Sequence, residues 1–153
     1  MKLYLVQHGN PVPKEKNPER PLSDPGVRDV RRTADFIEKK GVYVEEVLHS
    51  GKTRARQTAE IMAAGINPDV EILEKEGLSP LDPPGIFAQY LMDRKRDLMV
   101  VGHLPHLSKL VSFLVSGIES VPVVRFQQGG VVCLEKEKED GWTIIWMLIP
   151  EII

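Results

Sequence analysis

Three short stretches with strand-like patterns, each leading to a polar residue, constrain the fold of this chain most strongly. Residues 2–6 lead to His8, residues 42–49 are followed by Ser50, and residues 98–102 are followed by His103. The third stretch is a continuous apolar run, which is typical of a strand buried on both faces of a sheet. We therefore expect strands that deliver these polar residues to their carboxyl ends.

Helical patterns separate the expected strands. Ser23 is a good N-cap, and apolar residues recur at helical spacing from Val27 until Gly41 ends the helix. Further helices are expected over 51–64 with Gly65 as the stop, over 86–94, and over 104–115 with Gly117 as the stop.

The order of these elements predicts the fold class. A short strand is expected over 69–73, and a C-terminal hairpin over 129–135 and 142–149 with a charged turn at 136–141. Strands alternating with helices predict an α/β protein, a three-layer sandwich whose mostly parallel central sheet has helices on both faces. At 153 residues, the chain is expected to form a single domain, residues 1–153.

Composition excludes several classes of partner. The formal charge of -2 provides no basic footprint, so we expect no nucleic acid and no membrane as partner. No apolar run approaches the ~20 residues that cross a bilayer. The single cysteine, Cys133, lies in an apolar run and is expected in the core, which fits a cytoplasmic protein.

Two irregular segments interrupt the pattern. Residues 9–22 contain four prolines, and residues 77–85 contain three, so regular structure is not expected in either. Loops of this length are usually functional, and the second is a candidate lid. Gln127 to Gly130, before the hairpin, either line the pocket from the far side or simply form a turn.

Two histidines at strand ends with an arginine between them match the needs of phosphoryl transfer. An imidazole nitrogen of His8 or His103 is able to attack phosphorus and form a covalent intermediate. The guanidinium of Arg54, one helical turn beyond Ser50, is able to hold the non-bridging oxygens as charge develops. His103 and His106 form an H-x-x-H, but no further ligand has suitable spacing, so no metal or cofactor is expected. His106 is expected to cap its helix or face solvent.

The residues resemble the histidine phosphatase superfamily, with its phosphoglycerate-mutase-like fold, and are most similar to the small bacterial phosphohistidine phosphatases. The similarity rests on three motifs in the family's order. They are Gln7-His8-Gly9, Ser50 followed by Arg54-Ala55-Arg56-Gln57-Thr58, and Gly102-His103-Leu104-Pro105.

The resemblance implies roles for individual residues. His8 would be the nucleophile, Arg54 a phosphate clamp and His103 a second imidazole on the phosphate. Further phosphate contacts would come from the neighbours of these residues and from the long loop, namely Gln7, Gly9, Asn10, Arg20 and Ser50. For Arg20 a solvated side chain, and for Asn10 a turn role before proline, are the alternatives.

The family has an arginine where this chain has Gln7. Glutamine retains N–H donors but loses the charge and the bidentate fork. Three outcomes follow: Arg20 or Lys14 compensates, the enzyme is slow, or the fold binds phosphorylated ligands without turnover.

Family members that hydrolyse esters use an acidic residue to protonate the leaving group, and Glu76 and Asp82 are the candidates here. A phosphoramidate relaxes that need, because an imidazole departs neutral once its other nitrogen is protonated. The sequence therefore favours hydrolysis of protein phosphohistidine through a phospho-His8 intermediate without a metal, with inorganic phosphate as product. The alternatives are a small-molecule phosphomonoesterase and a pseudophosphatase that binds phosphorylated ligands.

Overall fold

The computed structural model describes residues 1–138 and 141–153. The elements along the chain are β1 (Lys2–Gln7), α1 (Asp24–Lys39), β2 (Glu46–His49), α2 (Thr53–Ile66), β3 (Glu71–Glu74), α3 (Pro84–Leu91), β4 (Leu98–Gly102), α4 (His106–Ser116), β5 (Val131–Glu137), β6 (Gly141–Leu148) and the 3-10 turn η1 (Pro150–Ile152). The tip of the turn predicted over 136–141 lies outside the described residues.

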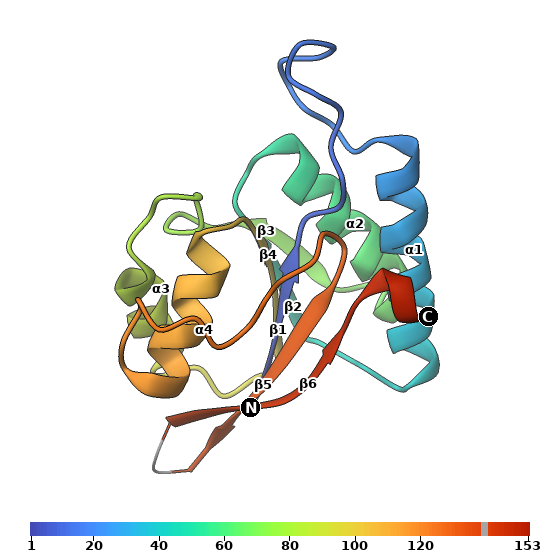
Figure 1. Ribbon diagram of the computed structural model, residues 1–153. Coiled ribbons are helices and arrows are strands. Elements are labelled where there is room, and N and C mark those ends of the chain that lie inside the picture. Colours follow the sequence, from blue (N-terminus) through green and yellow to red (C-terminus); the bar gives the residue numbers. More distant parts are fainter. Residues whose placement is uncertain (139–140) are drawn as a thin grey trace.

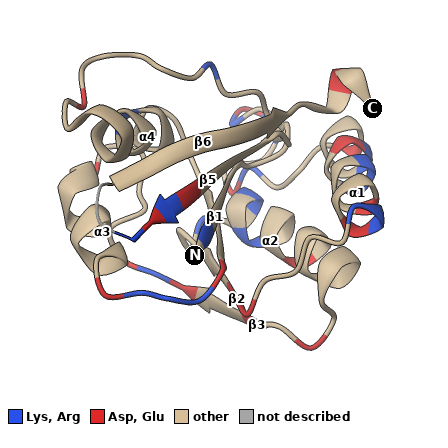
Figure 2. Ribbon diagram, turned by 90° about the horizontal axis from the view of Figure 1, so that it is seen from below, with Lys and Arg blue, Asp and Glu red and all other residues tan. Residues whose placement is uncertain are grey.

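Within the described residues, the strands form one six-stranded sheet in the order β3-β2-β4-β1-β5-β6. β3, β2, β4 and β1 run parallel, whereas β5 and β6 are antiparallel and form the C-terminal hairpin. Helices α1 and α2 cover one face of the sheet, and α3 and α4 cover the other, as Figures 1 and 2 show. The predicted three-layer α/β sandwich is confirmed.

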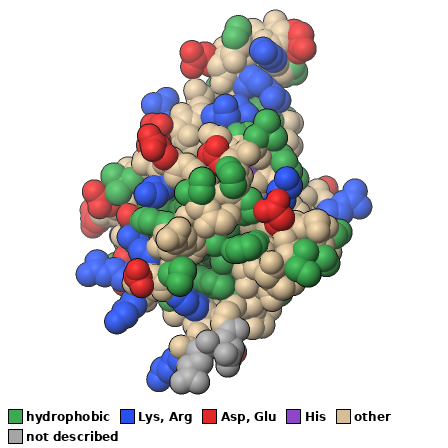
Figure 3. All heavy atoms as spheres, turned by 90° about the vertical axis from the view of Figure 1, so that its left-hand side faces the viewer, with side chains coloured by type: hydrophobic (Ala, Val, Ile, Leu, Met, Phe, Trp, Pro, Cys, Tyr) green, Lys and Arg blue, Asp and Glu red, His purple; other side chains and the backbone are tan. Residues whose placement is uncertain are grey.

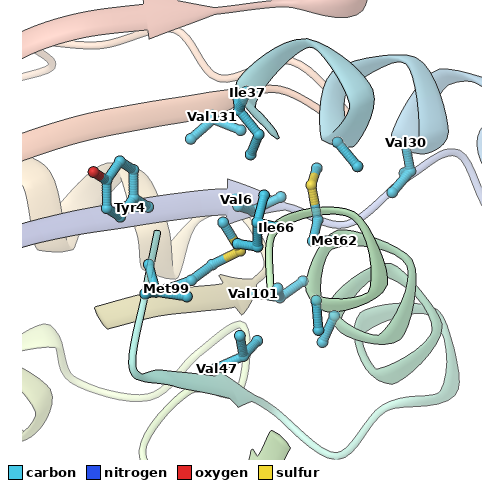
Figure 4. Packing of buried hydrophobic residues seen from close by; sticks show 14 of the residues in the cluster. Tyr4, Val6, Val30, Ile37, Val47, Met62, Ile66, Met99, Val101 and Val131 are labelled. Carbon is cyan, nitrogen blue, oxygen red and sulfur yellow. The ribbon is translucent and has the colours of Figure 1, made fainter. Parts of the chain in front are cut away.

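The period-two alternation of the central strands builds a separate core on each face of the sheet. Tyr4 and Val6 of β1 pack toward α1 and α2 with Val30 and Met62 (Figure 4). The residues between them, such as Leu5, pack toward α3 and α4. β4 is buried at every position, as its continuous apolar run predicts. Cys133 also lies in the core, as expected.

The outer surfaces of the two helical layers differ. α1 carries interspersed basic and acidic side chains on its solvent face (Figure 2). The side of α3 and α4 shows apolar side chains among the charged ones (Figure 3), including the exposed Leu81, Ile86 and Phe113. No helix among the described residues is long and apolar enough to cross a membrane.

Three local predictions are wrong. α2 continues through Gly65 to Ile66, and the glycine serves packing instead, since a Cβ there would lie 3.1 Å from Cβ of Ala34 on α1. α3 begins at Pro84, inside the segment predicted to be irregular, because proline fits the first turn of a helix. β2 comprises only Glu46–His49 of the predicted 42–49, because the preceding residues connect it to α1.

Candidate active site

The carboxyl ends of β2, β4 and β1 meet at one edge of the sheet, because these three parallel strands are adjacent. They place Ser50, His103 and His8 together, and the first turn of α2 adds Arg54. The backbone N–H of His8 donates to the carbonyl of Gly102 at 3.1 Å, so the chain leaves β1 in register with β4. The long proline-containing loop projects beyond this edge (Figure 1).

His8 is held in a defined tautomer. Its Nδ1 lies 2.7 Å from the carbonyl oxygen of Gly9, which only accepts, so Nδ1 carries the proton. Nε2 is left with its lone pair and accepts from Nε of Arg54 at 3.3 Å. Burial, followed by the charges of Arg54 and Arg20, lowers the pKa of His8 to about 4. At neutral pH, Nε2 is therefore an unprotonated nitrogen beside a cation.

His103 lies against His8, with ring centroids 4.9 Å apart. Its Nε2 shares a 2.5 Å hydrogen bond with the hydroxyl of Ser50. Burial lowers the pKa of His103 to about 3; His8, when protonated, and the charge of Arg54 act in the same direction. Within the described residues its buried Nδ1 has no hydrogen-bond partner. Both imidazoles of the pair are therefore neutral in the free protein.

Two guanidinium groups act electrostatically on this pair, those of Arg54 and Arg20. Burial and the charge of Arg20 lower the pKa of Arg54, and Arg20 also lowers that of His8, so the loop brings Arg20 to the site. The backbone of Arg20 has a φ of 47°, and its Nε donates to the carbonyl of Val12 at 3.4 Å. Neither arginine forms an ion pair within the part of the chain that the structure describes. Two cations without counter-charges beside neutral imidazoles favour the binding of an anion at this site.

Gln57 and Thr58 have positioning roles that the sequence did not reveal. Oε1 of Gln57 accepts from the backbone N–H of Leu22 at 2.7 Å, which ties the long loop to α2. The hydroxyl of Thr58 accepts from the N–H of Gly9 at 3.1 Å and donates to the carbonyl of Arg54. Both residues belong to the motif that follows Ser50 in the sequence, but that motif did not indicate which loop they contact.

Gly9 and Asn10 are fixed by the start of α1. A Cβ on Gly9 would lie 2.7 Å from a methyl of Val30, so the close approach that this glycine permits is to the helix. The carbonyl of Asn10 accepts from both the backbone N–H and the hydroxyl of Ser23, and that hydroxyl also caps α1 as predicted. The backbone beyond His8 is thus held on two sides.

Gln7 is only 8% exposed and lies at the wall of a cavity of about 350 Å³. Gln127 and Gln128 line the same cavity, and the N–H of Gly130 donates to the carbonyl of Gln127, so this segment forms a turn, one of the two alternatives expected from the sequence. The backbone carbonyl of Gln7 accepts from Gly129, whereas its side-chain Oε1 is buried and has no partner among the described residues.

Glu76 and Asp82 lie on the other side, where they line a cavity of about 550 Å³ that also touches Ser50. Glu76 is exposed, and the Asp82 carboxylate accepts from the N–H of Ser79 at 2.8 Å. None of the described hydrogen bonds connects either acid to His8 or His103.

The two remaining histidines have structural surroundings. Nδ1 of His49 accepts from the N–H of Gly51 at 3.0 Å, as a strand-end structural residue would. His106 was expected to cap its helix or face solvent, but it is fully buried at the start of α4, and neither ring nitrogen has a partner within residues 1–138 and 141–153. The first turn of α4 faces the core with Leu107, so position 106 is enclosed. Across these same residues, no group of three or more His, Cys, Asp or Glu is placed to hold a metal ion.

Comparison with known proteins agrees with this geometry. The model of the histidine phosphatase superfamily (branch 1) matches residues 3–82, just over half of the chain, which include His8, Ser50 and Arg54. Phosphohistidine phosphatase SixA of Escherichia coli (strain K12) is 26% identical, over 98% of this chain and 94% of the relative.

Solved structures share the fold. The protein histidine phosphatase SixA complexed with tungstate superimposes with a TM-score of 0.88 at 23% identity, covering 99% of both chains. A phosphoserine phosphatase of Entamoeba histolytica superimposes with a TM-score of 0.73 at 16% identity, covering 95% of both chains. With His8 and His103 at strand ends, Arg54 beside them and a family model that matches just over half of its residues, the chain belongs to the histidine phosphatase superfamily.

Proposed function

We propose that the protein hydrolyses phosphohistidine on other proteins through a phospho-His8 intermediate, without a metal, and releases inorganic phosphate. The observation that carries the proposal is the state of His8. Its Nδ1–H is held by Gly9, and Nε2 is unprotonated at neutral pH and faces Arg54. The similarity to a relative named phosphohistidine phosphatase supports the substrate class.

In the first step, Nε2 of His8 attacks phosphorus, and the bond from phosphorus to the substrate imidazole breaks. The bonding electron pair returns to the leaving nitrogen, and the imidazole departs neutral because its other nitrogen carries the proton. In this proposal Arg54, Arg20 and Gln7 donate to the non-bridging oxygens, and His103 with its bonded Ser50 completes the set of donors.

In the second step, water attacks phosphorus of phospho-His8. The phosphorus–nitrogen bond breaks, its electron pair returns to Nε2, and the phosphate leaves with the oxygen of the water. The proton lost by the water remains on the phosphate or passes to solvent. His8 returns to its starting tautomer, because Gly9 still accepts from Nδ1–H.

The placement of the acidic residues favours a phosphoramidate over an ester. An alkoxide leaving group needs a proton from a positioned acid. Asp82 is bonded to a backbone N–H, and Glu76 is exposed, so neither is held against the histidine pair. An imidazole with a reference pKa of ~6.5 leaves without such an acid.

Two alternatives have specific support. Glu76 and Asp82 line a cavity that reaches Ser50, which favours a small-molecule phosphomonoesterase if a substrate draws one of them toward the phosphate. Gln7 in place of the family arginine favours a weakened enzyme that binds phosphorylated ligands.

The test compares wild type with His8→Ala on a phosphohistidine-bearing protein and on p-nitrophenyl phosphate. We expect His8-dependent release of phosphate from the protein substrate and much slower turnover of the ester. Faster turnover of the ester would favour the phosphomonoesterase. No His8-dependent release from either would overturn both enzymatic functions.

A further inference from the structure

Beside the histidine pair lies a cavity of about 350 Å³ whose wall contains four carboxamide side chains. We name it the amide pocket, and its carboxamides belong to Gln7, Asn10, Gln127 and Gln128. Two carboxylates, Asp29 and Glu151, also line it, and within the described residues no lysine or arginine does. Leu104 and Phe126 supply apolar surface.

We propose that the amide pocket is the subsite for the organic group attached to the phosphate, and that it selects a neutral, hydrogen-bonding group over an anionic one. The imidazole of a phosphohistidine is such a group. The inference rests on the proposed function, because it requires that the phosphate lies between His8 and Arg54.

The position of the pocket along the chain supports this assignment. Gln7 directly precedes His8, and Leu104 directly follows His103, so both imidazoles have a neighbour in the pocket wall. The cavity on the opposite side includes Ser50, whose hydroxyl is bonded to His103. The proposal places the organic group on the side of Gln7 and Leu104, and the test below compares the two cavities.

The far wall of the pocket is attached to the same strand that carries His8. The N–H of Gly129 donates to the carbonyl of Gln7 at 2.9 Å, and the N–H of Gly130 donates to the carbonyl of Gln127 at 2.9 Å. In Figure 1 the segment leading into β5 accordingly passes beside the end of β1. Gln127 is thus held relative to the nucleophile by backbone bonds that a side-chain substitution leaves intact.

Charge and hydrogen bonding define the ligand class. The cations of the site, Arg54 and Arg20, belong to α2 and the long loop and line no part of this pocket. A carboxylate placed there would face amides and acids without a counter-charge, which disfavours it. Among the residues that the structure describes, the buried Oε1 of Gln7 has no hydrogen-bond partner. A carboxamide presents both a donor and an acceptor, so the wall favours a group that offers hydrogen bonds.

The volume of the pocket also fits a single ring. About 350 Å³ lies at the lower end of the ~300–1,000 Å³ range typical of small-molecule sites. In its apolar wall, Phe126 is buried at 6% exposure, whereas Leu104 is exposed.

Binding of two phosphonates tests the proposal without requiring turnover. Phenylphosphonate carries a neutral ring and phosphonoacetate carries a second anion, and their dissociation constants are measured by calorimetry at constant salt. We expect wild type to bind phenylphosphonate more tightly. Gln127→Lys, which places a cation in the amide pocket, should tighten phosphonoacetate on the order of tenfold and change phenylphosphonate less than about twofold.

The matched control is Ser79→Lys, which places the same cation in the cavity beside Ser50. Ser79→Lys should leave the dissociation constants of both phosphonates within about twofold of wild type. Gln128→Lys places a cation at an exposed position of the amide pocket. It should also tighten the binding of phosphonoacetate, but less than Gln127→Lys does, because solvent screens an exposed cation more strongly.

Two results would overturn the inference. A gain for phosphonoacetate with Ser79→Lys alone would place the organic group in the other cavity. Equal affinities in wild type that neither glutamine variant alters would show that the amide pocket is not used. Failure of both phosphonates to bind at all is a different result, because it would contradict the phosphate site of the proposed function and the inference with it.

Discussion

The two sides of the candidate site differ in how firmly their side chains are held. On the phosphate side, His8, Arg54, Ser50 and His103 form hydrogen bonds in two pairs, and Thr58 connects the loop to the helix. On the side of residues 76–82, Glu76 is exposed and Asp82 is bonded only to its own turn. This difference is consistent with the proposed function, in which the leaving group needs little acid assistance.

The largest expected effect comes from the nucleophile. His8→Ala should lower kcat for phosphohistidine hydrolysis by roughly 10⁴-fold, because the covalent route is lost. The measurement is phosphate release from a phosphohistidine protein. His49→Gln is the control, since His49 bonds a turn, and it should stay within about tenfold of wild type. Equal losses in both variants would contradict the assignment of His8.

Substitution of Arg54, the proposed phosphate clamp, should have the next largest effect on kcat. Arg54→Lys keeps the charge but loses the Nε–H that faces His8, and kcat should fall by about 10²–10³-fold. The matched control is Arg56→Lys on the same helix, where the native side chain is exposed and pairs with Glu60. It should behave like wild type, and a loss there as large as at Arg54 would show a general effect on α2.

The neutral state of His8 predicts a pH dependence of stability. Its folded pKa of about 4 lies below the ~6.5 of an unfolded histidine, so between these values the unfolded chain binds the additional proton. The free energy of unfolding should therefore fall as pH decreases from 7 to 4, by about 3 kcal/mol for His8. Urea denaturation of wild type and of His8→Gln at several pH values measures this change in the free energy of unfolding. The same pH slope in both would contradict the lowered pKa.

Restoring the family arginine should give a smaller gain. Gln7→Arg adds a cationic fork next to His8 and should raise kcat/KM for p-nitrophenyl phosphate by about tenfold, less than the full effect of one donor because Arg20 already contributes charge. Steady-state kinetics of wild type and Gln7→Arg measure this change in kcat/KM. An unchanged rate would show that Arg20 already fills the role.

The acidic residues should have the smallest effect. Glu76→Gln and Asp82→Asn should each change phosphohistidine hydrolysis by less than about twofold, because the imidazole leaves without a donated proton. The same variants assayed on an alkyl phosphate, whose alkoxide leaving group does need a donated proton, sharpen the comparison between the two sides. A large loss on phosphohistidine with either variant would mean that this side takes part in catalysis.

The strand ends were predictable from sequence because buried parallel strands have continuous apolar runs and their carboxyl ends share an edge. The bounds of β4 were predicted correctly, and His8, Ser50, Arg54 and His103 lie together as expected. These features depend on local patterns and on a topology with few alternatives.

What the sequence did not reveal depends on contacts between distant segments. Gly65 has the pattern of a helix stop, yet its role is the close approach of α1 and α2. His106 looks solvent-facing in sequence, but the packing of α4 encloses it. Gln57 and Thr58 matter because the long loop returns to them, and no local pattern reports where a loop returns.

The central claim is that phosphate passes through Nε2 of His8, and trapping the phosphoenzyme tests it most directly. The protein is mixed with a ³²P-phosphohistidine protein, quenched in alkali, digested and mapped. We predict label on the peptide that contains His8, stable in alkali, lost in acid and absent from His8→Ala. Phosphate release without label on that peptide, or label that persists in His8→Ala, would contradict the account.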